Sequence, residues 1–130
     1  MTAEDKLQEI CITMFRAKYP EMAKILLAVP NGGSRNVIEA VKLKRMGVTP
    51  GVADLILLTP RHGYGSLCLE LKVKKGDIYN IGKKNIVVAR NGNQSDKQHE
   101  WELEAMSNGN KYVICWDVKE FLNEIEMYLN

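Results

Sequence analysis

Three polar residues near the middle of the chain have the types and spacing of a metal-dependent catalytic site. Asp54 begins one apolar stretch, and fifteen residues separate it from Glu70, which lies with Lys72 in a second apolar stretch. The turn-rich segment 60–65 between them predicts a β-hairpin. If the hairpin turns near His62, positions whose numbers sum to about 124 face each other, so the Cβ atoms of Asp54 and Glu70 lie roughly 5 Å apart.

Strand alternation places Lys72 on the same face as Glu70. Two carboxylates this close raise each other's pKa unless a cation lies between them. A hard divalent ion with oxygen ligands removes this conflict, and magnesium typically binds one or two carboxylates together with phosphate oxygens. The alternative is a structural ion pair between Lys72 and one of the carboxylates on an exposed sheet face, and the spacing alone leaves both interpretations open.

Apolar periodicity and turn residues predict the elements that must position these side chains. Helices are expected over residues 3–18, 35–46, 95–107 and 118–129. Strands are expected over residues 24–29, 53–59, 66–73 and 111–116, with a second, smaller hairpin over 77–89. Thr2 is expected to cap the first helix and Ser34 the second, and Tyr112 is expected in the core. The order predicts an α/β fold, a mixed β-sheet flanked by helices.

Length and composition set limits on the class of protein. A chain of 130 residues with 45% hydrophobic and 26% charged residues predicts one globular domain over residues 1–130. No apolar run approaches the roughly 20 residues that span a bilayer, and the charged start resembles no signal peptide, so we expect no membrane and an intracellular, cytoplasmic location. The three cysteines are far apart, which argues against a disulfide framework or a zinc cluster.

The charge is unevenly distributed along the chain. Residues 61–97 carry eight Lys or Arg against three acids, whereas residues 98–130 carry two lysines against seven acids. The middle of the chain would therefore attract a polyanion, although a solvated mixed-charge surface is the alternative. The candidate phosphate contacts are Asn31, Gly32, Gly33, Arg35, Lys74, Lys75, Lys83 and Lys84. The glycine loop could equally serve only to turn the chain.

Five motifs in order along the chain carry a family resemblance. They are Glu4-x3-Gln8, Pro30-Asn31-Gly32-Gly33-x-Arg35, Gly47-Val48-x-Pro50-Gly51-Val52-x-Asp54, Glu70-Leu71-Lys72, and Ser95-x-x-Gln98 before Trp101. Together they resemble the VRR-Nuc (virus-type replication-repair nuclease) branch of the PD-(D/E)xK nuclease superfamily. The chain departs from the family in having Ala53 where proline usually precedes the aspartate. It also has a longer connection, residues 74–93, after the Glu-x-Lys motif.

The resemblance implies a restriction-endonuclease-like (PD-(D/E)xK) core with an extra β-hairpin, and it implies roles for several residues. The ligands of Mg²⁺ or Mn²⁺ would be Asp54, Glu70 and the main-chain carbonyl of Leu71. Lys72 would orient the attacking water and stabilise the transition state. Gln98 would hydrogen-bond near the active site. Glu4, rather than Glu9, would be the accessory acid of the first helix, because it shares a helical face with Leu7.

The function implied is that of a metal-dependent, structure-selective DNA endonuclease acting on branched DNA, as in four-way (Holliday) junction resolvases of phages and prophages. Such an enzyme would work inside a bacterial host. The alternatives are a non-catalytic DNA-binding module and a flap or nicking endonuclease. A sequence-specific restriction enzyme is disfavoured, because 130 residues leave little room for base-reading elements.

A homodimer is expected from the same resemblance and from the second hairpin. This hairpin carries an apolar set too large to expose on a small monomer: Ile78, Tyr79, Ile81, Ile86, Val87 and Val88. These side chains would either form the contact between two subunits or fold back on their own domain.

Overall fold

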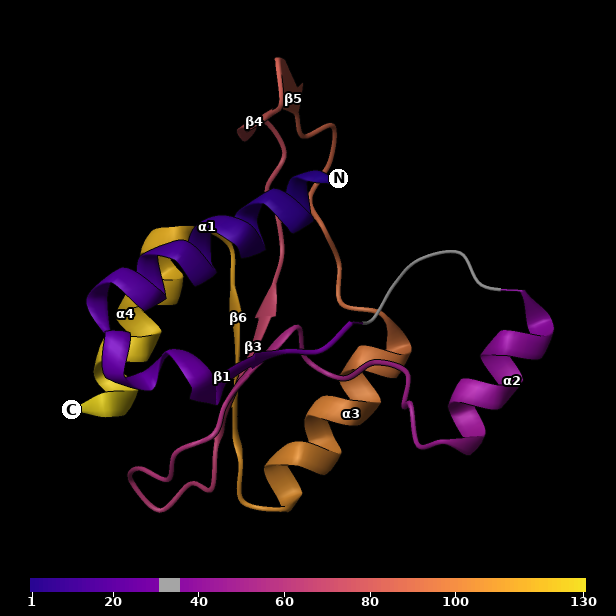
Figure 1. Cartoon of the computed structure of the whole chain (residues 1–130), viewed down its shortest axis with the longest axis vertical. Helices are drawn as coiled ribbons and strands as arrows, with labels where there is room; N and C mark the ends of the chain where they lie inside the picture. Colours follow the sequence, from indigo (N-terminus) through magenta and orange to yellow (C-terminus); the bar gives the residue numbers. More distant parts are fainter. Residues whose placement is uncertain (31–35) are drawn as a thin grey trace.

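The computed structural model describes residues 1–30 and 36–130. Its helices are α1 (Ala3–Lys18), the 3₁₀ helix η1 (Pro20–Ile25), α2 (Val37–Arg45), α3 (Asp96–Ser107) and α4 (Val118–Leu129). Its strands are β1 (Leu26–Ala28), β2 (Leu55–Leu57), β3 (Leu67–Leu71), β4 (Ile78–Ile81), β5 (Lys84–Val87) and β6 (Lys111–Cys115). The predicted α/β fold, a mixed sheet with flanking helices and an extra hairpin, is confirmed (Figure 1).

The main sheet has the strand order β1-β2-β3-β6, with β4 and β5 forming a separate hairpin. Strand β3 pairs antiparallel with β2 and parallel with β6. Leu55 faces Leu69 and Leu57 faces Leu67, so the register predicted from the sequence is confirmed. Extending this register by one residue brings Asp54 opposite Glu70.

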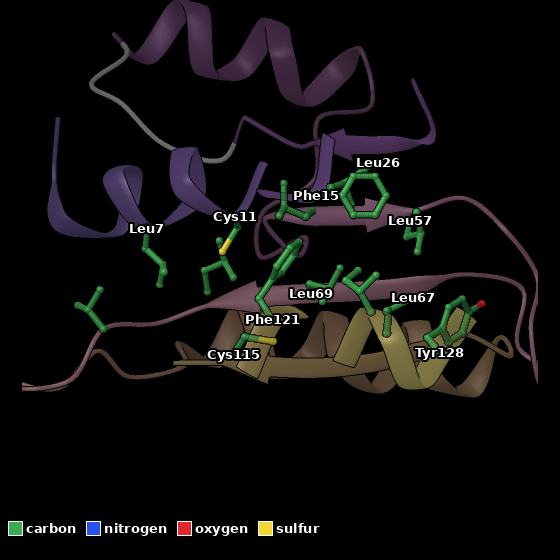
Figure 2. Close-up of a cluster of buried hydrophobic side chains, with 14 of the residues drawn as sticks. Leu7, Cys11, Phe15, Leu26, Leu57, Leu67, Leu69, Cys115, Phe121 and Tyr128 are labelled. Atoms are coloured by element: carbon green, nitrogen blue, oxygen red, sulfur yellow. The ribbon is translucent and has the colours of Figure 1, made fainter. Parts of the chain in front are cut away.

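The two faces of the sheet have different coverings. Helices α1 and α4 cover one face, where Phe15, Phe121 and Leu69 belong to the main core (Figure 2). Helix α3 covers the other face, where Trp101 packs against a small cluster of Ala53, Cys68 and Tyr112. Because side chains alternate along β3, Leu69 and Leu71 enter the main core while Glu70 points to the side of α3.

Most predicted helix boundaries agree with the structure. Thr2 caps α1 in a capping box with Asp5, as expected. The prediction that Ser34 caps the second helix is wrong, because α2 begins at Val37 and its N-cap is Asn36, whose Oδ1 accepts a hydrogen bond from Glu39 N at 2.7 Å. Ser34 itself lies outside the described residues.

The predicted buried strand over residues 24–29 is also wrong in extent and exposure. Residues 20–25 form η1, so β1 has only three residues, and only Leu26 among them is buried. Among the strands that the structure describes, β1 lies at the edge of the sheet beside β2, which explains why its other side chains reach solvent.

The second hairpin places its apolar residues on two sides. Tyr79 packs against the main core and Val88 is part of it, whereas Ile78 and Val87 are 64% and 61% exposed. The inner residues therefore fold back on their own domain and the outer ones remain accessible. None of the described helices is long and apolar enough to cross a membrane.

Candidate active site

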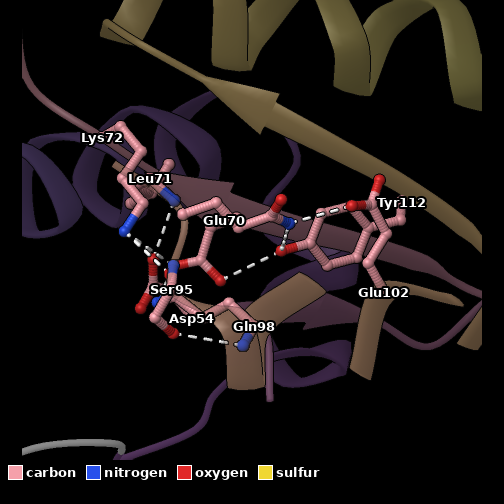
Figure 3. Close-up of polar contacts among 9 residues, drawn as sticks. Asp54, Glu70, Leu71, Lys72, Ser95, Gln98, Glu102 and Tyr112 are labelled. Atoms are coloured by element: carbon pink, nitrogen blue, oxygen red, sulfur yellow. Dashed lines mark hydrogen bonds and ion pairs between the residues drawn. The ribbon is translucent and has the colours of Figure 1, made fainter. Parts of the chain in front are cut away.

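The site forms where the end of β3 meets the residue that precedes β2. Asp54 is held there by its carboxylate, because its Oδ2 accepts a hydrogen bond from the main-chain N–H of Leu71 at 2.7 Å (Figure 3). Its main-chain carbonyl accepts a second bond from the N–H of Val29 at 2.9 Å. The carboxylate of Asp54 is thus fixed beside the residues that follow Glu70.

Glu70 is the most buried of the polar residues in the site, with 1% of its surface exposed. Its Oε1 accepts a hydrogen bond from Gln98 Nε2 at 3.2 Å, and its Oε2 accepts one from the Tyr112 hydroxyl at 3.3 Å. Lys72 Nζ lies 4.0 Å from Glu70 Oε1. The carboxylate is therefore held from α3 and from β6 at the same time.

Gln98 contacts both Glu70, on β3, and Lys72, directly after β3. Its amide oxygen accepts from Lys72 Nζ at 3.1 Å and from the main-chain N–H of Ser95 at 2.8 Å. The second contact belongs to the capping box of α3, in which Ser95 is the N-cap. The same side chain that begins α3 therefore also orients Lys72 and Glu70.

The site carries more negative charge than it can easily hold. Burial, together with the neighbouring carboxyl of Asp54, raises the pKa of Glu70 to about 9, although Lys72 and the Tyr112 hydroxyl oppose the shift. The alternative interpretation expected an ion pair on an exposed sheet face. Lys72 and Glu70 do form an ion pair at 4.0 Å, but both residues are buried, so the expected exposure is wrong. A carboxylate pair in which Glu70 is buried and Asp54 half-buried, with one lysine beside it, is a site where a further cation would be stabilised.

Glu4 reaches the site from the first turn of α1. Burial raises its pKa, with Lys72 lowering it and Asp54 raising it further, so Glu4 lies near both residues. The chain that returns from the hairpin closes this side: a Cβ atom on Gly92 would lie 3.1 Å from Glu4 Oε1 and 3.2 Å from Lys72 Cδ. Glu9, by contrast, is exposed and pairs with Lys6 at 2.9 Å.

The donor set fits a hard divalent ion. Carboxylate oxygens of Asp54 and Glu70 lie together, and their negative charge is only partly offset by Lys72. Within the described residues, no group of three or more His, Cys, Asp or Glu side chains is placed to hold a metal. A metal here would therefore take its remaining ligands from the main chain, water or a phosphate, which is how magnesium is commonly bound.

A close approach of the chain fixes α3 relative to Asp54. Gly51 has φ +82°, and a Cβ atom there would lie 2.3 Å from the carbonyl oxygen of Lys97 in the first turn of α3. No side chain fits in this space. Gly51 is therefore required for steric reasons. Its lack of a side chain lets the start of α3, with Gln98, lie against the segment that carries Asp54.

Of the predicted DNA contacts, the four lysines lie within the described residues. Asn31, Gly32, Gly33 and Arg35 lie outside the described residues. Lys83 and Lys84, at the end of the hairpin, are exposed, and so is Lys75. Lys74 is exposed but lies 4.0 Å from Glu120 on α4, with which it forms an ion pair.

The sequence interpretation missed the polar role of Tyr112. Its ring lies in the small cluster under α3, as expected of a core residue, but its hydroxyl contacts Glu70. Two further side chains continue the network, since Gln94 Nε2 lies 3.4 Å from the Tyr112 hydroxyl and 2.9 Å from Glu102 Oε1. The parallel pairing of β3 with β6 would have revealed this contact, but no turn in the sequence specifies that register.

Comparison with known proteins agrees with this geometry. No family model matches the chain, and no curated protein sequence matches it. A solved structure of a VRR_NUC domain protein superposes with a TM-score of 0.73 over 99% of this chain and 89% of that one, at 22% sequence identity. The chain therefore shares the fold of that protein, and the resemblance predicted from the motifs is confirmed at the level of the fold.

Proposed function

We propose that this chain, which has the fold of a VRR_NUC domain protein, is a metal-dependent DNA endonuclease with a PD-(D/E)xK-type centre. The observation that carries the proposal is the buried Glu70 carboxylate, held beside Asp54 and within 4.0 Å of Lys72 Nζ. A protein that needed only a stable sheet would be better served by apolar residues at these positions, because a buried charge cluster is costly to desolvate.

The residues divide the work of phosphodiester hydrolysis between them. Asp54, Glu70 and the main-chain carbonyl of Leu71 would hold Mg²⁺ or Mn²⁺. Such an ion, when bound, lowers the pKa of a coordinated water and neutralises charge on the scissile phosphate. Lys72, held by Gln98 at 3.1 Å, orients the attacking water and stabilises the negative charge of the transition state.

Glu4 and Gln98 support this centre from two helices. Glu4 would add a third carboxylate near Lys72 and Asp54, as an accessory acid that could accept a hydrogen bond from water in the site. Gln98 donates to the carboxylate of Glu70 and accepts from the ammonium of Lys72, so it would hold both side chains in place. The motifs predict Glu4 as an accessory acid and Gln98 as a hydrogen-bonding residue near the site, and both proposed roles extend these expectations.

For the substrate we propose branched DNA, with a four-way (Holliday) junction as the first candidate. We propose that a homodimer cuts it, in the cytoplasm of a phage-infected bacterium. One centre hydrolyses one bond at a time, so two symmetric cuts need two centres related by a two-fold axis, which a C2 dimer provides. The exposed outer residues of the hairpin, Ile78 and Val87, offer apolar surface for a subunit contact. A flap or nicking endonuclease would need only one centre.

The decisive experiment compares linear duplex, flap and four-way junction DNA incubated with Mg²⁺, Mn²⁺ or EDTA. Asp54→Asn, Glu70→Gln and Lys72→Ala should each lower the cleavage rate by at least ~10²-fold, the usual scale for removing a preorganised charge. The exposed Lys119→Ala is the matched control and should cleave normally. Full activity in EDTA or in Glu70→Gln contradicts the proposal, and binding without cleavage by the wild-type protein favours a non-catalytic DNA-binding module.

A further inference from the structure

We propose that Tyr112 is a positioning residue for the metal site: its hydroxyl holds the Glu70 carboxylate in the orientation that binds the ion. The inference rests on the proposed function, because it assigns Glu70 as a metal ligand. Tyr112 lies on β6, outside the five motifs that carry the family resemblance.

The ring of Tyr112 is held rigidly under α3. The residue is 9% exposed, and its ring centroid lies 6.2 Å from that of Trp101 in a tilted arrangement. Ala53 and Cys68 complete the cluster around it. A side chain packed in this way has little freedom, so its hydroxyl is presented to Glu70 from a fixed direction.

The hydrogen-bond partners set the direction in which the Tyr112 proton points. The Gln94 side chain approaches the Tyr112 oxygen at 3.4 Å and Glu102 Oε1 at 2.9 Å with the same atom, Nε2. Glu102 can only accept, so this atom is the amide nitrogen, and it donates to the Tyr112 oxygen as well. The hydroxyl proton of Tyr112 is then directed to Glu70 Oε2, 3.3 Å away (Figure 3).

The arrangement leaves Glu70 oriented but still able to bind a metal. Each of its oxygens accepts one hydrogen bond, Oε1 from Gln98 and Oε2 from Tyr112. A carboxylate has about four lone-pair sites, so two remain for other partners. Hydrogen bonds to ligating carboxylates from outside the ligand shell are typically worth about 10–100-fold in metal affinity.

The test measures metal affinity directly, without DNA. In calorimetric titrations with Mn²⁺, Tyr112→Phe should bind about 10–100-fold more weakly than the wild type. Tyr128→Phe is the matched control, because it removes another buried hydroxyl, bonded to the Thr59 carbonyl at 2.7 Å on the opposite face of the sheet. Its Mn²⁺ affinity should equal that of the wild type.

Cleavage assays at increasing Mn²⁺ concentration add a second readout. Tyr112→Phe should approach the wild-type rate once the metal is saturating, because only the affinity is lowered. Lys72→Ala should stay slow at every metal concentration, since its defect lies in the chemical step. A Tyr112→Phe rate that no metal concentration restores overturns the positioning role.

The outcomes separate this inference from the proposed function. Unchanged Mn²⁺ affinity in folded Tyr112→Phe, while Glu70→Gln abolishes binding, overturns the inference and leaves the proposed function standing. If the wild-type protein binds no Mn²⁺, both are overturned. If thermal denaturation shows that Tyr112→Phe is not folded, Gln94→Met is used instead, because it removes the hydrogen bond that directs the Tyr112 hydroxyl. A Mn²⁺ affinity of Gln94→Met equal to that of the wild type would then overturn the inference.

Discussion

Replacing Glu70 with glutamine should change how the stability of the metal-free protein depends on pH. Burial beside Asp54 raises the pKa of Glu70 from about 4.5 to about 9 in the folded state. Between these two values the folded protein holds one proton more than the unfolded chain does. The stability associated with that proton is fully present below pH 4.5 and is lost as the pH rises toward 9.

The size of the effect follows from the linkage relation. One extra bound proton changes the free energy of unfolding by about 1.36 kcal/mol per pH unit, so about 2.7 kcal/mol should be lost between pH 6 and pH 8. Glutamine has no proton to lose, so Glu70→Gln lacks this contribution. The difference in unfolding free energy between the wild type and Glu70→Gln should therefore fall by about 2.7 kcal/mol over this interval.

Urea denaturation in EDTA at pH 6, 7 and 8 measures this difference. Glu104→Gln is the control: it removes an exposed carboxyl group from α3 and should keep the wild-type slope. Mn²⁺ should stabilise the wild type more at pH 8 than at pH 6, because a ligating carboxylate must be deprotonated. Parallel pH curves for the wild type and Glu70→Gln would refute the argument that burial keeps a proton on Glu70.

Three further predictions concern binding, assembly and packing. Replacing Lys83 and Lys84 with alanine should weaken binding to every DNA sequence and flatten the salt dependence by roughly two units of slope in fluorescence anisotropy; unchanged affinity gives the hairpin another role. Light scattering should report about twice 14.7 kDa, and a cruciform plasmid should become linear, whereas a monomer that only nicks it contradicts the dimer. Gly51→Ala should lower both the melting temperature and the cleavage rate, because its Cβ atom would meet Lys97 O at 2.3 Å. Gly63→Ala, at the same φ of +82° but with nothing within 4 Å, should cost less.

The part of the site that could be predicted from the sequence lies on one antiparallel hairpin. Strands β2 and β3 follow each other in the chain and pair antiparallel, so the position of the turn determines which residues face each other. Asp54, Glu70 and Lys72 could therefore be placed on one face. The position of Gln98 near the site could be predicted from the Ser95-x-x-Gln98 motif. Its hydrogen bonds with Glu70 and Lys72 agree with that position.

The part that could not be predicted depends on pairings between distant segments. Strand β6 follows β3 by about forty residues and pairs with it in parallel, so no local signal indicates that Tyr112 lies near Glu70. The N-cap of α2 could not be predicted for a different reason. Ser34 and Asn36 are both good N-cap residues, and they lie only two positions apart. The extent of β1 depended on the edge of the sheet, which becomes apparent only once the strand order is known.

The second hairpin leaves and rejoins the domain through a short ladder of main-chain contacts. Gly92 N–H donates to the Val73 carbonyl at 2.8 Å, and Gly76 N–H donates to the Val88 carbonyl at 2.9 Å. The hairpin beyond these two hydrogen bonds therefore extends away from the part of the chain in which Lys72 is already bonded to Gln98. The chain can therefore change the length or surface of the hairpin tip while the spacing of the site is kept, so the tip is a position at which substrate preference or subunit contacts could diverge independently of the chemistry.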